Sequence, residues 1–369
     1  MNTQLSLQRR FGLLLRQRSV QAVVVLWVLA NVLVIVVAHG RLPFDRPTVA
    51  DASFASQLVF ANLGLVEVIA LIAVTYLLTR RRSIPDMAAR APARAQARRE
   101  TLLLIAYGLL AQVSGVVIGM ALGWRPFSFH LAGTLYGTHE QVAQAEAVTW
   151  AFYNLIVYAV VPYLFFRRRY SNEQLNLKSS NRRNDLLVIA AILVIESLVE
   201  VFSFSSSIFD LSAGQLLLGV PLTFALYFAG TVLPTMIFIY AILLPRYLKL
   251  TGSIATTAIL GGVTYTLAHA LDAWTVYTSA QAAFLSVAFL FFQYFGPGLI
   301  KSVLTLRTGN AWVHAIAYHA VAPHVLIDTP HIVRVFNIRW VAGVKRWFWM
   351  WFWFGGFDVG GVVAPQSSV

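Results

Sequence analysis

The sequence predicts an all-α fold, a polytopic helical membrane protein with about nine transmembrane helices. Of its 369 residues, 58% are hydrophobic and only 12% are charged, and the mean hydropathy of +0.69 is far above that of soluble domains. Nine apolar stretches are close to or longer than the roughly 17–25 residues that a membrane-spanning helix needs. They lie at 20–38, 57–78, 101–122, 148–166, 185–204, 215–244, 254–271, 280–300 and 311–326.

The net charge of +13 has a topological origin. Twenty-one of the 28 Lys and Arg residues lie before the first span or in the loops after spans two, four, six and eight. The opposite loops hold only Arg41, Arg46 and Arg125 before the tail, which carries the other four, Arg334, Arg339, Lys345 and Arg346. By the positive-inside rule, this asymmetry predicts an integral protein of the plasma (inner) membrane with a cytoplasmic N-terminus. The expected partner is therefore the lipid bilayer and not a nucleic acid, which would need one contiguous basic face with interleaved aromatic residues.

Two basic segments and a kinked span divide the chain. Residues 1–184 are predicted to form an accessory N-terminal membrane half of four spans with basic cytoplasmic loops, and residues 185–326 a helical core. Within the first half, the Ala/Arg-rich linker 79–100 is either a solvated charge run or a helix on an anionic membrane surface. The sixth span contains Pro221 and Pro234, so we expect it to be kinked or broken.

Residues 327–369 are predicted to form a C-terminal interfacial aromatic tail. Its run "WFWMWFWF" at 347–354 cannot form a single apolar helix face, and aromatic residues concentrate at membrane interfaces. A partner-binding or pigment-contacting surface is the alternative for this run.

Ionisable residues inside predicted spans are candidate site residues, because a polar group in the hydrocarbon region is costly. Glu196 and Glu200 are four residues apart and share a helix face, so they would share a proton or need a cation. For each glutamate, the alternative is a protonated acid hydrogen-bonded to a neighbouring helix. The remaining candidates are Glu67 in span two, His269 in span seven, and His314, His319 and His324 in span nine.

The histidines of spans seven and nine suggest a pair across two helices. Asp272 lies one turn after His269 and could orient its imidazole. On an α-helix that turns about 100° per residue, a five-residue step rotates a side chain by roughly 140°. One helix therefore cannot direct His314, His319 and His324 at one metal ion. We expect His269 to approach His319, with His314 facing elsewhere.

Two stretches of the core carry a family resemblance. The stretch "YTLAH" runs from Tyr265 to His269, and "LRTGNAWVHAIAYHAV" leads to His319. They resemble the second and third motifs, FxxxH and HxxxN, of the CPBP family, the intramembrane metalloproteases of the CAAX-protease and bacteriocin-processing type. The resemblance covers roughly residues 185–326 and implies that His269 and His319 are metal ligands.

The first family motif, EExxxR, is degenerate in this chain. The stretch "AILLPRYLKLTGS" is similar to the residues that come after that motif in the family, which places the paired glutamates on Thr235 and Met236 and the arginine on Tyr240. The asparagine of the third motif falls on Pro323. The resemblance therefore implies a site that keeps two histidines and lacks the carboxylates that would activate water.

Three functions are expected as alternatives. The first is a catalytically degenerate binding or scaffold subunit of a membrane complex, with a membrane-protein partner and no cofactor. The second is an active intramembrane metallopeptidase that holds zinc and uses Glu200 or Glu196 as its catalytic base. The third is a subunit whose histidines ligate haem or a pigment. Since the chain has no cysteine, thiolate chemistry is excluded.

Overall fold

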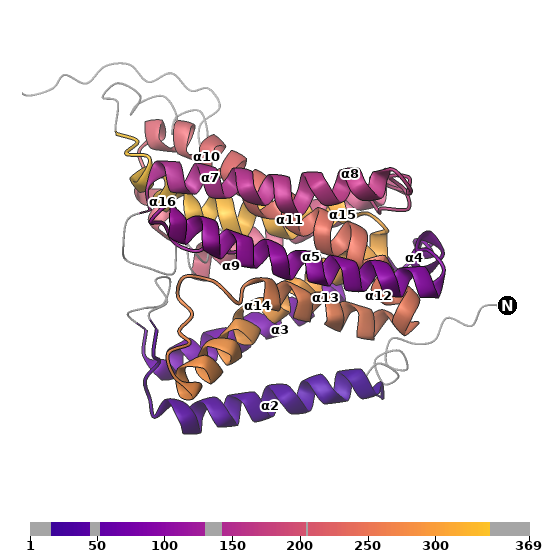
Figure 1. Ribbon diagram of the computed structural model, residues 1–369, viewed down its shortest axis with the longest axis horizontal. Helices are drawn as coiled ribbons and strands as arrows, with labels where there is room; N and C mark the ends of the chain where they lie inside the picture. Colours follow the sequence, from indigo (N-terminus) through magenta and orange to yellow (C-terminus); the bar gives the residue numbers. More distant parts are fainter. Residues whose placement is uncertain (1–15, 45–51, 130–141, 204–205, 340–369) are drawn as a thin grey trace, which may run out of the picture.

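The protein is a bundle of helices that run between two common ends (Figure 1). The computed structural model describes residues 16–44, 52–129, 142–203 and 206–339, and within these ranges it contains helices and no strand. Seven helical segments are long and apolar enough to cross a membrane, which confirms the all-α polytopic membrane fold. They are α2 (Arg18–Ala38), α3 (Phe54–Leu78), α5 (Arg94–Ala121), α7 to α8 (Gln144–Arg167), α9 (Arg182–Ser203), α10 to α12 (Ala213–Thr251) and α14 (Ala280–Thr308).

The seventh and ninth predicted spans are also helical, but their ends differ from the prediction. Helix α13 (Ile254–Ala268) is apolar and only 15 residues long, and it ends before residue 271. The ninth predicted span passes through α15 (Ala311–His314), η5 (Ala315–Leu326) and α16 (Ile327–Val335) without a break. The predicted domain boundary at residue 326 therefore lies inside a helical segment. The aromatic run 347–354 is outside the described residues.

The sixth predicted span is continuous, although it contains several prolines. Between α10 (Ala213–Tyr227) and α12 (Leu244–Thr251), two π-helical segments, η3 (Phe228–Val232) and η4 (Met236–Leu243), flank the single turn α11 (Leu233–Thr235). A proline lacks the N–H that an α-helix needs and clashes with the preceding turn. A local shift to i→i+5 hydrogen bonds keeps the segment helical.

The basic loops meet at one end of the bundle. The Arg82 guanidinium pairs with the Asp185 carboxylate. Nη1 of Arg90 donates to the carbonyl oxygen of Gly309 at 2.7 Å. Nη2 of Arg94 donates to the carbonyl oxygen of Leu250 at 3.1 Å. The loops after spans two, four, six and eight are therefore neighbours in space, as the charge asymmetry requires.

Several basic residues counted with these loops lie inside helices, and two of them, Arg246 and Lys301, are almost completely buried. Arg246 is buried in α12, where its Nε donates to Oε2 of Glu100 at 2.7 Å and its Nη2 lies 2.6 Å from the same oxygen as an ion pair. Lys301 is buried in α14, with Nζ 3.7 Å from the centroid of the Tyr265 ring. The prediction that these two cations belong to the loops was wrong, because the helices extend further than the apolar stretches.

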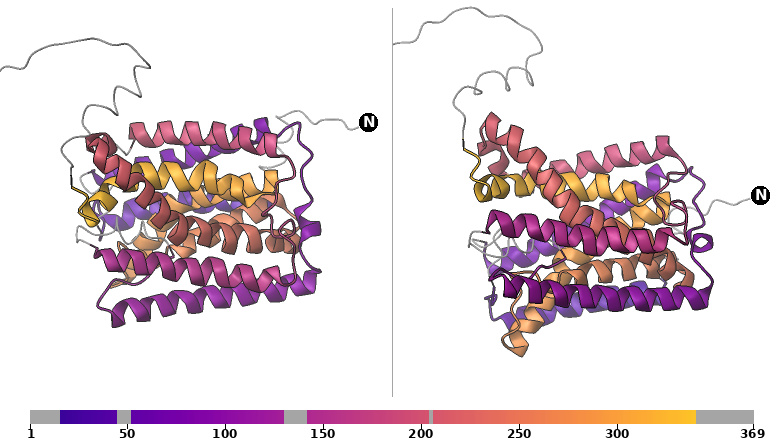
Figure 2. Two further views of the ribbon diagram at one scale, coloured as in Figure 1. Left: turned by 90° about the horizontal axis from the view of Figure 1, so that it is seen from above. Right: turned by 45° about the horizontal axis from the view of Figure 1, so that its top comes forward.

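The hydrophobic core joins the two predicted halves of the chain. One cluster of buried side chains includes Val34 of α2 and Leu104 of α5 together with Ile239 of η4 and Phe289 of α14. Helix α14 is buried along most of its second half and packs against α3 and α13. Helices α2 and α3 of the first half pack against α14, α12 packs against α13, and Figure 2 shows segments of both halves interleaved in the bundle. Polar side chains on these inner helices are therefore shielded from lipid.

Candidate functional site

His314, His319 and His324 form a row inside the bundle. His319 and His324 lie on η5, and His314 directly precedes it. The i→i+5 hydrogen bonds of a π-helix bring residues five apart into line. The ring centroids are 6.5 Å apart between His314 and His319 and 5.2 Å apart between His319 and His324. The prediction that His314 faces away from His319 was wrong, because it assumed α-helical geometry.

His269 is held in one orientation by two neighbours. Helix α13 ends at Ala268, and the turn after it brings Asp272 back beside the imidazole. Nδ1–H of His269 donates to Oδ2 of Asp272 at 2.9 Å, and the Tyr294 hydroxyl donates to the same oxygen at 2.8 Å. The Tyr294 ring also stacks on His269, with centroids 3.5 Å apart. The expected carboxylate–histidine pair is present, and it directs Nε2 away from Asp272.

The two histidines that the family resemblance selects pack against one tyrosine. The Tyr265 ring centroid is 4.9 Å from that of His269 and 6.0 Å from that of His319. The Tyr265 hydroxyl is 3.5 Å from Nε2 of His319, at the outer limit of a hydrogen bond. Because Lys301 lies over the same ring, a cation, a phenol and two imidazoles share this part of the bundle.

A second histidine–aspartate pair lies at the end of the histidine row. Nδ1–H of His324 donates to Oδ2 of Asp328 at 2.9 Å, and its ring stacks on Tyr227 with centroids 4.5 Å apart. Sequence reasoning missed Asp328 because it lies beyond the predicted end of span nine. The i, i+4 spacing of His324 and Asp328 was the available signal. Lys301 and Tyr294 were missed too, and only the tertiary structure places them at the site.

The three membrane-depth glutamates form a group beside this second pair. The carboxyl groups of Glu67 on α3 and Glu196 on α9 lie close enough to interact with each other. Glu196 also interacts electrostatically with Glu200 and with Lys301. Glu200 interacts electrostatically with Glu67 and Asp328. The structure therefore links the two predicted catalytic glutamates to Glu67, Lys301 and the His324–Asp328 pair.

Neutral side chains occupy the positions that the resemblance aligns with the first motif of the CPBP family. Thr235 and Met236 are fully buried at the junction of α11 and η4. The Tyr240 ring lies against His314, with centroids 4.2 Å apart, and its hydroxyl donates to the carbonyl oxygen of Gly298 at 3.3 Å. An aromatic contact thus stands where the family's arginine would be, and the side chains aligned with the glutamates carry no carboxylate.

The described part of the cluster offers few donors to any one metal ion. Among the residues that the structure describes, no group of three or more His, Asp or Glu side chains is placed to hold one metal ion. A catalytic zinc takes three protein ligands and one water. His269 and His319 supply two imidazoles, while Asp272 is already bonded to His269.

The fold and the site together define a polytopic helical membrane protein. Its helices enclose a polar cluster of imidazoles, carboxyl groups, phenols and the Lys301 ammonium group. No protein-family model matches the chain, and neither a curated protein nor a solved structure is significantly similar to it.

Proposed function

We propose that this protein is a catalytically degenerate relative of the CPBP intramembrane proteases that acts as a binding or scaffold subunit of a membrane complex. One observation carries the proposal: Thr235, Met236 and Tyr240 stand where the resemblance expects two glutamates and an arginine, and all three are buried. Metal-assisted hydrolysis needs a base within hydrogen-bond reach of the metal-bound water. The aligned positions supply no such base.

The retained polar cluster favours binding over a purely structural role. Burying a polar group without full hydrogen bonding costs about 1–3 kcal/mol. Nε2 of His314, at one end of the histidine row, is buried without a hydrogen-bond partner among the described residues. A polar group of a bound helix or ligand would satisfy this atom. The partner we propose is a membrane protein whose polar side chain or backbone reaches the cluster.

The test combines elemental analysis, proteolysis and co-purification of the full-length protein. Wild type, Glu200→Gln and His269→Ala would each be purified and incubated with a prenylated peptide and with a membrane peptide. We expect less than stoichiometric zinc, no cleavage by any of them, and a membrane protein that co-purifies with wild type in constant ratio. Stoichiometric zinc, with cleavage that both variants lose, would establish an enzyme and contradict the proposal.

A second candidate is an active intramembrane metallopeptidase in which Glu200 replaces the missing base. The interaction of Glu200 with Asp328, next to His324, is the observation that favours it. In that enzyme the metal would lie nearer His324 than the family resemblance implies. His324→Ala would then abolish cleavage together with Glu200→Gln, whereas Thr235→Ala would leave cleavage unchanged.

A further inference from the structure

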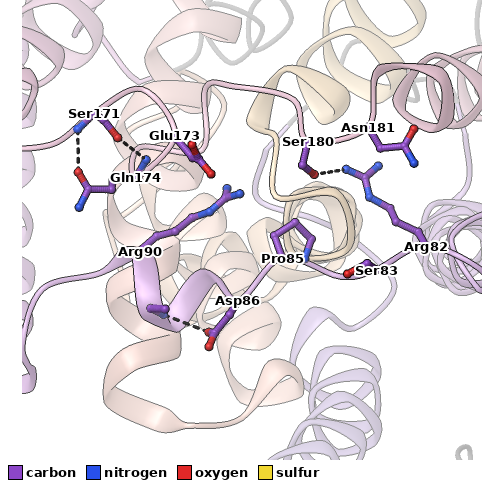
Figure 3. Close-up of a pocket in the computed structure, with 11 residues that line it drawn as sticks. Arg82, Ser83, Pro85, Asp86, Arg90, Ser171, Glu173, Gln174, Ser180 and Asn181 are labelled. Atoms are coloured by element: carbon purple, nitrogen blue, oxygen red, sulfur yellow. Dashed lines mark hydrogen bonds between the residues drawn. The ribbon is translucent and has the colours of Figure 1, made fainter. Parts of the chain in front are cut away.

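A cavity of about 590 Å³ lies at the end of the bundle where the basic loops meet (Figure 3). One wall is the linker between α3 and α5, which contributes Ser83, Asp86 and Arg90. The other wall is the loop between α8 and α9, which contributes Ser171, Glu173 and Asn181. The volume is that of a small-molecule site, and the lining is rich in hydroxyl, amide and charged groups. Its ligand must therefore be polar.

Arg90 is positioned as a cationic arm of this cavity. Its Nη1 donates to Oδ1 of Asn176 at 2.9 Å and to the carbonyl oxygen of Gly309 at 2.7 Å, which anchors one edge of the guanidinium. Figure 3 shows the guanidinium reaching toward the middle of the pocket, below Glu173. No described residue makes a hydrogen bond with its Nε or Nη2. The Glu173 carboxylate, which also lines the cavity, interacts electrostatically with this guanidinium, so a ligand would compete with it for these donors.

Two arginines, Arg82 and Arg90, and two carboxylates, Asp86 and Glu173, line the cavity. Partial burial lowers the pKa of the Arg90 guanidinium, Glu173 opposes this shift, and the positive charge of Arg82 adds to it as the smallest of the three effects. The Arg82 guanidinium already interacts with other residues of the protein, because it pairs with Asp185 and donates to Oγ of Ser180 at 2.9 Å. A bound anion would restore the stabilisation that Arg90 loses on burial.

The cavity lies where four of the apolar helices begin or end. Helices α3 and α8 end, and α5 and α9 begin, at this end of the bundle. Clusters of Lys and Arg next to membrane spans attract anionic lipids. Five further cations flank the two walls in sequence, namely Arg80, Arg81, Lys178, Arg182 and Arg183.

We propose that this cavity binds the phosphate group of an anionic phospholipid, with Arg90 as its principal partner and Ser83 and Asn181 as hydrogen-bonding neighbours. A guanidinium suits this role because it can give two parallel hydrogen bonds to phosphate oxygens. The same chemistry would accept a soluble phosphate compound, so the test separates the two sources. This site is distinct from the buried histidine cluster and does not depend on its function.

The test is native mass spectrometry of the delipidated full-length protein titrated with phosphatidylglycerol or phosphatidylcholine. Arg90→Gln removes the charge, and Arg81→Gln is the matched control, because Arg81 is exposed and does not line the cavity. Ala89→Trp fills the cavity without a charge change, and Ala95→Trp, on the exposed start of α5, is its control. Inorganic phosphate and ATP are added separately as soluble competitors.

We expect Arg90→Gln and Ala89→Trp each to weaken phosphatidylglycerol binding by about 10-fold or more, which is the order expected for a lost charge-assisted hydrogen bond. The two controls should stay within about 2-fold of wild type, and phosphatidylcholine should bind weakly throughout. Displacement of the lipid by millimolar phosphate or ATP would support the same phosphate site with a soluble ligand. Equal binding by Ala89→Trp and wild type, or equal losses in variants and controls, would overturn the proposal.

Discussion

At the residue scale, Arg246 shows how a cation is accommodated inside the bundle. Two of its nitrogens bond to Glu100, and its guanidinium lies 4.6 Å from the centroid of the Phe166 ring. The Tyr170 hydroxyl donates to the other oxygen of Glu100 at 2.6 Å. Both charges of the ion pair are thus hydrogen-bonded, which is the condition under which a buried ion pair is tolerated. The pair ties α5 to α12.

Breaking this pair by removing one charge should destabilise the protein. We expect Glu100→Gln to lower the free energy of unfolding by about 3 kcal/mol, because it leaves the buried Arg246 charge uncompensated. The double variant Glu100→Leu with Arg246→Met should recover most of that loss. Denaturation midpoints in one detergent measure the effect. A single variant as stable as wild type would show that water reaches Arg246.

Tyr170 predicts a dependence of stability on alkaline pH. Burial, followed by the hydrogen bond to Glu100, raises the pKa of this phenol from 10.0 to about 12. The folded protein holds the proton more tightly than the unfolded chain, so its stabilising effect is present below about pH 10 and is lost as the pH rises toward 12. Between these values, the stability of Tyr170→Phe should fall less steeply than that of wild type. Parallel curves for the two proteins would contradict the assignment.

At the scale of elements, the change from α- to π-helical hydrogen bonding decides how the histidines are presented. On an α-helix, residues five apart diverge by roughly 140°. On η5 the rings of His319 and His324 come within 5.2 Å. Pro323 lies inside η5 and lacks the N–H that would close an α-helical turn. The row therefore depends on hydrogen-bond register as well as on residue spacing.

The contact between α13 and α14 positions Tyr265 and depends on glycine. A Cβ atom at Gly298 would lie 2.8 Å from Cα of Gly262 and 2.8 Å from Cβ of Tyr265. These distances are too short for a side chain, so a larger residue would force the two helices apart.

We therefore expect Gly298→Ala to reduce stability by about 1–3 kcal/mol through overpacking. Gly64→Ala in α3 is the control, because a Cβ atom there meets nothing within 4 Å. It should be neutral or stabilising by up to about 1 kcal/mol, since alanine favours helix more than glycine does. Thermal unfolding in detergent measures both variants. Equal effects of the two substitutions would show that the helices separate without cost.

At the scale of the whole molecule, the bundle has one basic end and one end with few cations. Arg81 follows the end of α3 at the first end, whereas Asp210 lies in the short helix η2 (Ser206–Asp210), which follows α9 at the other end. Both residues are exposed. By the positive-inside rule, the basic end should face the cytoplasm.

Single-cysteine labelling tests this orientation directly, because the chain has no native cysteine. In intact cells, a membrane-impermeant maleimide should label Asp210→Cys, whereas Arg81→Cys should react only after permeabilisation. The cysteine-free wild type reports background labelling. Reaction of both variants from the same side, or the reverse pattern, would refute the predicted orientation.

The helical membrane fold, the one-sided basic loops and the His269–Asp272 pair could be predicted from the sequence alone. Hydropathy over about 20 residues, the charge of a loop and the spacing of two residues within a few positions are local properties of the sequence. The structure that each of them favours depends little on the remainder of the chain. Only the tertiary structure decided which face each histidine presents, where Arg246 and Lys301 lie, and that Glu67 meets Glu196. Contacts between neighbouring helices determine these features. A shift between α- and π-helical hydrogen bonding changes few contacts within a helix, so prolines and packing against other helices decide which of the two forms.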